Sequence, residues 1–379
     1  MKNQFNISSF QTGLGIKSKY YLLLIMIVLN GCSKKREVPD IENGTPRNLV
    51  LIYIAGNNDL KLDAINSFEK IKKGYTFNAN NRVLIFLKSE SSSSYLLTLG
   101  AKKTDTLVKY GTENSSDPNF MKKVIADSRS KYKAEKIGMV LWSHATSWKP
   151  ALKTKSFGQD RGSEMDVRDL ARVLPKDLEF MIFDACTMGS VEVLYELRNN
   201  AKYIMASPAE ILSTSFPYQH ITDQLFNGVD GLKKIATDFI KYYEKETGLF
   251  QSATISLIQT DKLKFIADET SKLLDLKTPS SPFNKDLIQK LTFDTSNNVP
   301  SFDFSSFLQK NFSKSEAAVL GFKINEAVII KGNTHAFLGN EIDEFCGLSI
   351  YLPKPSDPNF SYYSSLQWSL DSRWDRLFR

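Results

Sequence analysis

Cysteine and histidine are scarce in this chain of 379 residues, which contains three of each. Three cysteines cannot form the disulfide framework of a small secreted protein, and a chain of this length can bury a core without one. The histidines and cysteines show no CxxC or HExxH spacing, so we expect no metal site. One disulfide, between Cys186 and Cys346, is a pairing that an exported protein would permit.

A concentrated positive charge is also missing. The formal charge of +7 falls to +4 if Lys2, Lys17 and Lys19 belong to a segment that is removed from the mature protein. No block of Lys and Arg with interleaved aromatic residues is present, and we find no internal repeat. We therefore expect no nucleic-acid partner.

The N-terminal apolar run is too short to cross a membrane. It covers the ten residues Tyr20–Leu29, whereas a membrane-spanning helix needs roughly 20. Basic residues precede it, as in a secretory signal, and Leu29-Asn30-Gly31-Cys32 follows, which resembles the bacterial lipobox. We therefore expect a lipoprotein signal peptide at residues 1–31 and a lipid on Cys32 that anchors the exported protein in the bacterial cell envelope. The alternative is a simple secretory signal with an incidental cysteine.

Short apolar runs alternate with helical periodicity after a polar segment, residues 32–47, which we interpret as a flexible tether. Helices are expected at 59–73, after Pro118, at 164–175 and at 191–200, and a hairpin is expected at 94–110. Strands are expected at 48–56, 82–89, 136–145, 178–185 and 201–207. Nearly continuous apolar strands that alternate with helices predict an α/β fold with a mostly parallel sheet, flanked by helices on both faces.

The signal weakens beyond about residue 250. Residues 253–260 and 347–353 look like strands around a helical region at 261–276. We therefore predict a main domain at 48–250 and a C-terminal α+β subdomain at 251–379 that packs on the sheet and completes the fold.

Two reactive side chains follow predicted strands. His144 comes after "GMVLWS" and Cys186 after "EFMIFDA". A single helix is predicted between the two strands, so a right-handed crossover would make them neighbours, with both residues at the carboxyl edge of the sheet. A nearby imidazole favours the reactive thiolate, and so does the start of a helix near Gly189. The alternative is a packed, unreactive cysteine beside a locally satisfied histidine.

The chain resembles the clostripain (C11) family of cysteine peptidases, which belongs to the clan of caspases, gingipains and legumain. The likeness covers residues 48–379 and rests on "VLWSHATSWKP", "MIFDACTMGSVEVLYELRNNAKYIMASPAEI", "SFPY" and "GLSIYLP". It implies a caspase-like fold, with His144 as catalytic acid and base and Cys186 as nucleophile. It also implies an oxyanion hole from the backbone N–H groups of Ala145 and Cys186. Asp184 would lie in a pocket that binds the Arg or Lys before the cleaved bond.

Two positions depart from the family's pattern. The residue after the histidine is typically Gly in this clan but is Ala145 here, and a positive φ there would cost alanine roughly 1 kcal/mol. In the next loop, Thr214 and Ser215 stand where many members have an acidic residue and a glycine, so the pocket has less negative charge. Glu210 is a candidate to replace that charge.

The resemblance also raises self-processing and calcium. Many members cleave themselves in the loop after the histidine, where this chain offers Lys149, Lys153 and Lys155. Some relatives respond to calcium, but no EF-hand-like loop is present, so we assign no cofactor and no metal site. Asp303 and Cys346 are interpreted as structural residues.

These observations together predict a lipid-anchored, monomeric cysteine endopeptidase that cleaves proteins or peptides after Arg or Lys through a thioester. A different class, an inactive envelope lipoprotein that keeps the fold and binds peptides or partners, is favoured by Ala145 and the weaker pocket. The presence of both His144 and Cys186 opposes it. A hydrolase of non-peptide acyl groups is also compatible with the same two residues.

Overall fold

The computed structural model describes residues 45–149, 156–276, 285–293 and 300–378. The expected signal peptide, Cys32 and most of the tether lie outside the described residues, as do Lys153 and Lys155. Residues 44–379 form one compact unit. Within the described ranges, none of the helices combines the length and the apolar character that a membrane crossing requires.

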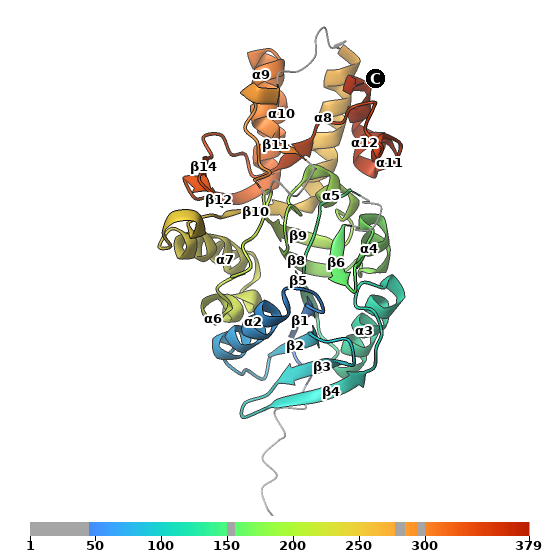
Figure 1. Ribbon diagram of the computed structural model, residues 1–379, viewed down its shortest axis with the longest axis vertical. Helices are drawn as coiled ribbons and strands as arrows, with labels where there is room; N and C mark the ends of the chain where they lie inside the picture. The colour runs from blue at the N-terminus through green and yellow to red at the C-terminus, as the bar shows by residue number, and fades with distance from the viewer. Residues whose placement is uncertain (1–44, 150–155, 277–284, 294–299, 379) are drawn as a thin grey trace, which may run out of the picture. The chain divides into compact units, whose positions relative to one another are not determined.

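A nine-stranded sheet runs through this unit in the order β12-β10-β9-β8-β5-β1-β2-β3-β4 (Figure 1). The five central strands, from β9 to β2, are parallel, and the two strands at each side are antiparallel. This confirms the predicted mostly parallel sheet and the predicted hairpin, β3 and β4. The strands are β1 Asn48–Ala55, β2 Asn81–Lys88, β3 Ser94–Leu99, β4 Thr104–Tyr110, β5 Lys136–Trp142, β8 Leu178–Asp184, β9 Ala201–Ala206, β10 Thr254–Gln259 and β12 Val328–Asn333.

Helices cover both faces of the sheet; in Figure 1, α2, α6 and α7 lie to its left and α3 and α4 to its right. One face packs α2, α6 and α7, and the other packs α3, α4, α5, α8, α10 and α12. The helices are α2 Lys61–Gly74, α3 Pro118–Lys131, α4 Val167–Val173, α5 Val191–Glu196, α6 Tyr218–Ile221, α7 Gly228–Tyr243, α8 Leu263–Leu276, α9 Phe304–Asn311, α10 Lys314–Ala327, α11 Phe360–Ser364 and α12 Gln367–Ser372.

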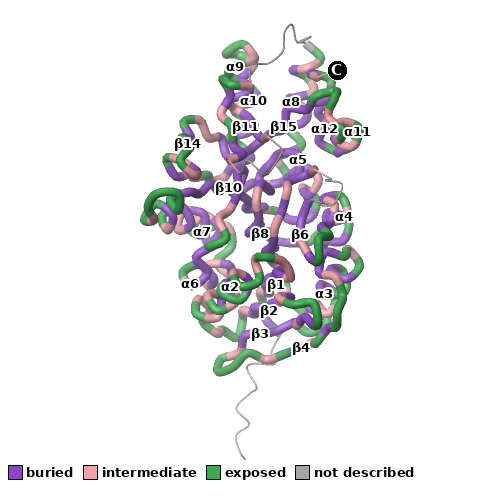
Figure 2. Tube along the Cα trace, viewed as in Figure 1, coloured by how far each residue is buried: buried purple, intermediate pink, exposed green. Residues whose placement is uncertain are grey.

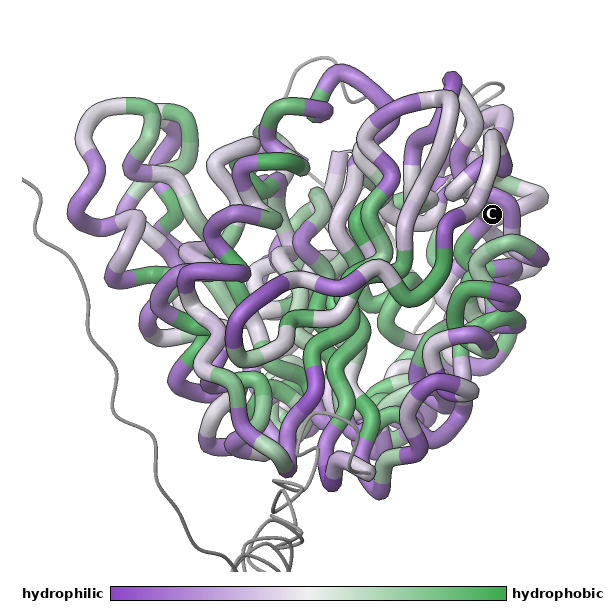
Figure 3. Tube along the Cα trace, turned by 90° about the horizontal axis from the view of Figure 1, so that it is seen from below, coloured by the Kyte–Doolittle hydropathy of each residue, from purple (hydrophilic) through white to green (hydrophobic). Residues whose placement is uncertain are grey.

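The strand sequences explain why both faces must be covered. Along β1, Leu49, Leu51 and Tyr53 join one apolar cluster, and Val50 and Ile52 join the other. Successive side chains of a strand point to opposite faces, so a continuous apolar run needs a helical layer on each side. The five parallel strands are accordingly mostly buried in Figure 2, and in Figure 3 the apolar strands lie inside a more polar surround.

The C-terminal part of the chain contributes to the main sheet, because β10 pairs with β9 and β12 pairs with β10. The expected strand at 347–353 is shorter and pairs elsewhere: β15 forms a two-stranded sheet with β11. Two further small sheets are hairpins, β6 with β7 and β13 with β14. The strands of these small sheets are β6 Phe157–Asp160, β7 Ser163–Met165, β11 Ser301–Asp303, β13 Ala336–Phe337, β14 Asn340–Glu341 and β15 Ser349–Tyr351.

Candidate active site

A cavity of about 460 Å³ opens at the carboxyl edge of the sheet. Its walls come from the ends of β5 and β8, from the loop after β9, and from the C-terminal part of the chain. The lining residues are Leu60, Trp142, Ser143, His144, Asp184, Ala185, Cys186, Glu210, Ile211, Leu212, Ser213, Ser215, Phe293, Phe337 and Leu338. Two larger hollows, of about 840 and 760 Å³, contain neither His144 nor Cys186.

Strand register places His144 and Cys186 at the same level of the sheet. β5 and β8 are parallel neighbours in which Trp142 pairs with Asp184, and Ser143 N–H donates to the Asp184 carbonyl oxygen at 3.3 Å. His144 and Cys186 each follow their paired residue by two positions. Since neighbouring strands lie about 4.8 Å apart, this register brings the two residues to one side of the sheet edge, and both line the cavity.

The His144 ring is oriented by a carboxylate. Its Nε2 lies 2.7 Å from Oδ1 of Asp59, which follows β1 at the same edge of the sheet. This hydrogen bond to His144 is the main reason why the pKa of Asp59 lies below its ordinary value. Asp59 thus binds Nε2, and Nδ1 is the ring nitrogen that this carboxylate does not bind.

The Cys186 thiol lies against the backbone of Ile211. Ile211 N–H donates to Sγ at 3.4 Å, and Sγ donates to the Ile211 carbonyl oxygen at 3.6 Å. An N–H donor at sulfur favours the thiolate, because hydrogen bonds to the charged form stabilise it. No disulfide joins Cys186 and Cys346, so the pairing that the sequence left open is not formed.

Asp184 lies on the polar floor of the cavity. Its Oδ2 accepts hydrogen bonds from Ser215 Oγ, from Tyr218 Oη at 2.8 Å and from Phe216 N–H at 3.5 Å. Ser215 in turn accepts a hydrogen bond from Trp142 Nε1 at 3.0 Å. Burial raises the pKa of Asp184 to about 6, and these donors limit the increase. Within the described residues, Oδ1 accepts no hydrogen bond from the protein, so it is available to a cation in the cavity.

Glu210 and Thr214, the other two residues predicted for this pocket, have different surroundings. Glu210 lines the cavity, but both of its carboxylate oxygens accept the N–H of Phe293, at 3.0 and 3.2 Å. Thr214 is exposed and is not a lining residue; its hydroxyl lies 2.8 Å from Tyr243 Oη. Ser215, whose hydroxyl reaches Asp184, takes the place expected for Thr214.

The backbone at Ala145 is free of the strain considered above. Among the described residues, those with positive φ do not include Ala145, so alanine carries no conformational penalty here. Ala145 and Phe157 form an isolated antiparallel bridge whose hydrogen bonds are made by the flanking residues, with Gly158 N–H donating to His144 O and Thr146 N–H donating to Ser156 O. In such a pair the central N–H points away from the partner strand.

The remaining wall of the cavity is apolar and comes from the C-terminal part of the chain. Phe293 and Phe337 stack with their ring centroids 5.0 Å apart, and Leu338 lies at the tip of the β13–β14 hairpin. All three residues line the cavity. We refer to Phe293, Phe337 and Leu338 as the apolar wall.

The sequence contained a signal for some of the residues that we did not predict, but not for all of them. Asp59 follows β1, so the rule that functional groups gather at the carboxyl ends of strands would have selected it, had it not been taken as the start of a helix. Ser215 and Tyr218 belong to the "SFPY" segment. The apolar wall had no such signal, because it lies about 100 residues or more beyond Cys186, where periodicity was weak.

No site for a metal is evident in the described part of the chain, which has no group of three or more His, Cys, Asp or Glu residues suited to hold an ion. Asp303 and Cys346 contact each other in the core: the carboxylate of Asp303 accepts the N–H of Cys346 at 2.6 Å and that of Ser306 at 2.9 Å. Burial raises the pKa of the Cys346 thiol to about 12. These contacts agree with the structural role expected for both residues.

Comparisons with known proteins agree on one family. The model of the clostripain family matches residues 52–378. A secreted C11 cysteine protease from Bacteroides thetaiotaomicron, solved with an irreversible peptide inhibitor, is 27% identical with a TM-score of 0.78, covering 87% of this chain and 99% of that chain. An inactive zymogen C11 protease from Parabacteroides distasonis is 29% identical with a TM-score of 0.77, covering 88% and 99%. The curated clostripain of Hathewaya histolytica is 23% identical over 230 residues, which span 49% of this chain but only 44% of that protein.

Proposed function

Because the chain belongs to the clostripain family of cysteine peptidases, we propose that it is an endopeptidase that uses Cys186 and His144 to cleave peptide bonds after Arg or Lys. The observation that carries this proposal is a single cavity lined by a thiol, an imidazole and a buried carboxylate, namely Cys186, His144 and Asp184. The first two supply nucleophilic catalysis, and the third supplies a counter-charge for a basic side chain.

The reaction follows from the groups in the cavity. Nδ1 of His144 takes the proton of the Cys186 thiol, and the sulfur attacks the carbonyl carbon of the peptide bond. The resulting oxyanion is held by the N–H groups of Ala145 and Cys186. When the C–N bond breaks, the imidazolium gives its proton to the leaving amine, and a thioester remains on Cys186. His144 then removes a proton from water, which attacks the thioester and releases the acid and the thiol.

Asp59 acts in this scheme as a positioning residue. Its hydrogen bond to Nε2 of His144 orients the ring so that Nδ1 faces the thiol and the leaving amine. Histidines that carry protons in catalysis need such a partner, because the second nitrogen sets the tautomer and the ring orientation. A carboxylate at this position also stabilises the imidazolium that forms during the reaction.

Asp184 accounts for the preference for basic residues. Oδ2 is held by Ser215, Phe216 and Tyr218, so the carboxylate keeps one orientation, with Oδ1 available to the incoming cation. Burial makes the ion pair stronger than it would be in water. The hydroxyl of Thr214 is directed to Tyr243 and both oxygens of Glu210 accept the N–H of Phe293, so we assign the basic side chain to Asp184.

Self-processing is proposed at Lys153 or Lys155 and not at Lys149. Lys149 follows Trp148, which is buried against Tyr351 and Tyr363 with ring centroids 5.0 and 4.9 Å apart. A protease binds its substrate in extended form over several residues. Cleavage after Lys149 would therefore require Trp148 to leave the core.

Export and lipid anchoring complete the proposal. One relative is a secreted protease, and the N-terminal apolar run is followed by Asn30-Gly31-Cys32. We therefore propose that residues 1–31 are removed and that Cys32 carries the lipid that anchors the enzyme in the cell envelope. No cofactor enters the mechanism, and calcium remains a condition to be varied in assays.

Fluorogenic peptides provide the test. Wild-type protein should cleave peptides that end in Arg or Lys before the reporter and should leave the corresponding citrulline and Glu peptides intact. Cys186→Ala and His144→Ala should abolish turnover, while Cys346→Ala should retain it. Wild type should be assayed before and after proteolytic activation, with and without calcium. The proposal is wrong if wild type cleaves no basic peptide faster than Cys186→Ala under any of these conditions.

A further inference from the structure

Leu338 has a backbone conformation that leucine rarely adopts. Its φ is +47°, and the next residue, Gly339, has a φ of +79°. The two residues connect β13 and β14, in which Phe337 pairs with Asn340, so they form a two-residue hairpin loop. Such loops require positive φ at both positions and normally use Asn, Asp or Gly there.

The hairpin gives only a partial reason for a leucine, because the half-buried Leu338 side chain packs against the small apolar cluster of Ala209, Leu291, Phe337 and Ile342. Leu338 N–H donates to Ser252 Oγ at 2.8 Å, and the Leu338 carbonyl accepts from Asn340 Nδ2 at 3.2 Å. Any residue could make these backbone contacts. A bulky residue in the left-handed region costs conformational free energy, and backbone strain of this kind clusters at functional sites. Leu338 lines the cavity that contains His144 and Cys186.

The cavity has room for a second side chain beside the basic one. At about 30 Å³ for each water-sized group, the seven non-hydrogen atoms of an arginine side chain fill roughly 200 Å³. That is less than half of the cavity of about 460 Å³. The floor at Asp184 and Ser215 is polar, whereas the apolar wall of Phe293, Phe337 and Leu338 offers no hydrogen-bonding side chain. The remaining space therefore suits an apolar group.

The apolar wall is fixed relative to the nucleophile. The Phe293 N–H donates to both carboxylate oxygens of Glu210. Ile211, which follows Glu210 in the chain, contacts the Cys186 sulfur through its backbone. Phe337 stacks on Phe293, and Leu338 follows Phe337. A short chain of contacts thus connects the wall to the reacting sulfur.

We propose that the apolar wall is a specificity subsite, in which Leu338 binds a large aliphatic or aromatic side chain of the substrate within two residues of the basic one. This inference rests on the proposed peptidase function and adds a second requirement to its substrate. Residues i and i+2 of an extended peptide are about 7 Å apart and point to the same face, so one continuous cavity can hold both side chains.

Peptides that vary one position at a time provide the test. In every peptide Arg precedes the cleaved bond. Four positions are varied one at a time, the two before the Arg and the two after it, and the varied position carries either Ala or Leu. At one position, wild type should prefer Leu over Ala by about tenfold or more in kcat/KM, as expected for several methylene groups in an apolar pocket. In Leu338→Asn and Leu338→Gly, the ratio of kcat/KM for the Leu peptide to that for the Ala peptide should fall most of the way to one.

Thermal unfolding separates a functional strain from a structural role. Leu338→Asn relieves the positive φ but loses the packing of Leu338 on its apolar cluster, so its melting temperature should stay within about 3 °C of that of wild type. Leu370→Asn places the same substitution on an exposed leucine of α12, outside the cavity, and should leave the Leu preference unchanged. A melting temperature of Leu338→Asn more than about 5 °C below that of wild type, together with an unchanged Leu preference, would show that Leu338 only stabilises the fold and would overturn the inference.

The outcomes distinguish this inference from the function on which it rests. If wild type cleaves the Leu and Ala peptides equally at every position, or if Leu338→Asn keeps the preference, the subsite is wrong and the peptidase stands. If wild type cleaves none of the peptides, both are wrong.

Discussion

Asp184 combines a cost in stability with a benefit in binding. Burial raises its pKa from the ordinary value of 3.8 to about 6. The folded protein therefore favours the protonated carboxyl, and the stability present below pH 4 is lost as the pH rises to 6 and beyond. This difference in pKa lowers the free energy of unfolding at neutral pH by about 3 kcal/mol relative to its value below pH 4. Maintaining a carboxylate at this cost is understandable if the charge binds a substrate cation.

Asp184→Asn should therefore make the protein more stable and less active. The amide oxygen of asparagine can still accept from Ser215, Tyr218 and Phe216, while the buried charge is removed. At pH 7.5 we expect the free energy of unfolding to increase by up to about 3 kcal/mol, and below pH 4 the gain should vanish. Cleavage of Arg peptides should fall at least 100-fold. Denaturant unfolding and peptide kinetics measure both effects; a less stable variant at pH 7.5 would contradict this account.

The same carboxyl should set the pH dependence of substrate selection. With a pKa of about 6, roughly a tenth of Asp184 is charged at pH 5 and about nine tenths at pH 7. The ratio of kcat/KM for an Arg peptide to that for its citrulline analogue should thus increase nearly tenfold over this range. Taking the ratio cancels the titration of the catalytic groups, and a flat ratio would exclude Asp184 as the binding carboxylate.

Asp59 should affect turnover without affecting stability, because its side chain is 78% exposed and its partner is His144. Asp59→Ala removes the hydrogen bond that orients the ring, so kcat should fall about tenfold while KM and the melting temperature stay unchanged. Asp59→Asn keeps an acceptor at Nε2 and should recover part of the loss. An Asp59→Ala enzyme with the wild-type kcat would leave the carboxylate without a role in catalysis.

At the scale of elements, the loop between Cys186 and α5 depends on a close backbone approach. A Cβ on Gly189 would lie 2.6 Å from the nitrogen of Pro208 and 2.7 Å from the carbonyl carbon of Ser207. Gly189 N–H also donates to the Ser207 carbonyl oxygen at 2.8 Å. These are backbone atoms, so no side-chain rotation can relieve the contact.

Gly189→Ala should therefore destabilise the fold by about 1–3 kcal/mol and displace the loop that carries Cys186. The matched control is Gly321→Ala in α10, where a Cβ meets nothing within 4 Å. This substitution should increase the free energy of unfolding by about 0.5–1 kcal/mol. Denaturant unfolding and the rate of Cys186 alkylation measure the two effects. Equal stability of the two variants would contradict the close approach.

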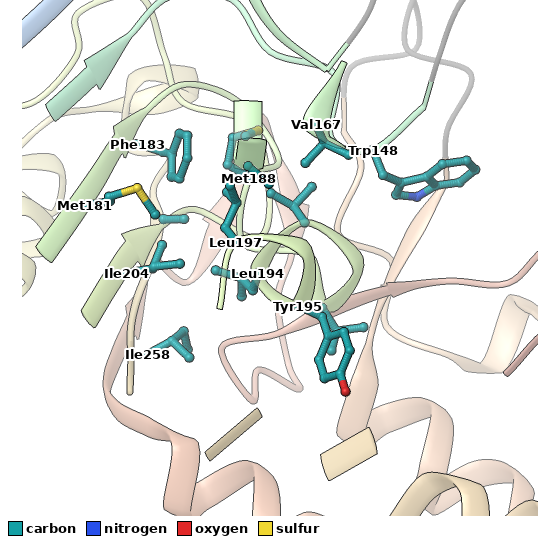
Figure 4. Packing of buried hydrophobic residues seen from close by; sticks show 14 of the residues in the cluster. Trp148, Val167, Met181, Phe183, Met188, Leu194, Tyr195, Leu197, Ile204 and Ile258 are labelled. Atoms are coloured by element: carbon teal, nitrogen blue, oxygen red, sulfur yellow. The ribbon is translucent and has the colours of Figure 1, made fainter. Parts of the chain in front are cut away.

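At the scale of the whole molecule, residues before and after position 250 share one core. Figure 4 shows Ile258 of β10 near Ile204 of β9 and Leu194 of α5 in the same apolar cluster. Glu192 of α5 is fully buried, and its Oε1 accepts from Tyr351 N–H at 2.9 Å and from Tyr363 Oη at 3.1 Å. Burial raises its pKa to about 7. Both tyrosines belong to the last 30 residues of the chain.

We therefore expect residues 44–250 not to fold without the remainder of the chain. Removal of β10 and β12 would expose the edge of β9, and removal of the C-terminal residues would uncover Glu192 and Trp148. Calorimetry of residues 44–379 should show one cooperative transition. Cooperative unfolding of isolated residues 44–250 would instead establish the domain boundary at 250 as a true one.

The order of the elements and the positions of the reactive groups followed from the sequence. Apolar runs of seven or eight residues could only be strands buried on both faces, and the parallel order brings their carboxyl ends together. His144 and Cys186 were selected in this way, because each follows a strand, whereas Asp184 was selected through the resemblance to the clostripain family. Local sequence is sufficient here, since the pattern repeats within a few residues.

Contacts between distant segments required the tertiary structure. The hydrogen bond between Asp59 and His144 spans 85 residues, and the wall of Phe293, Phe337 and Leu338 lies more than 100 residues from Cys186. Thr214 is exposed, whereas Ser215, with a φ of +68°, is buried and directs its hydroxyl to Asp184. Periodicity reports only which face of an element is buried, whereas these features depend on which faces meet, and only the folded chain decides that.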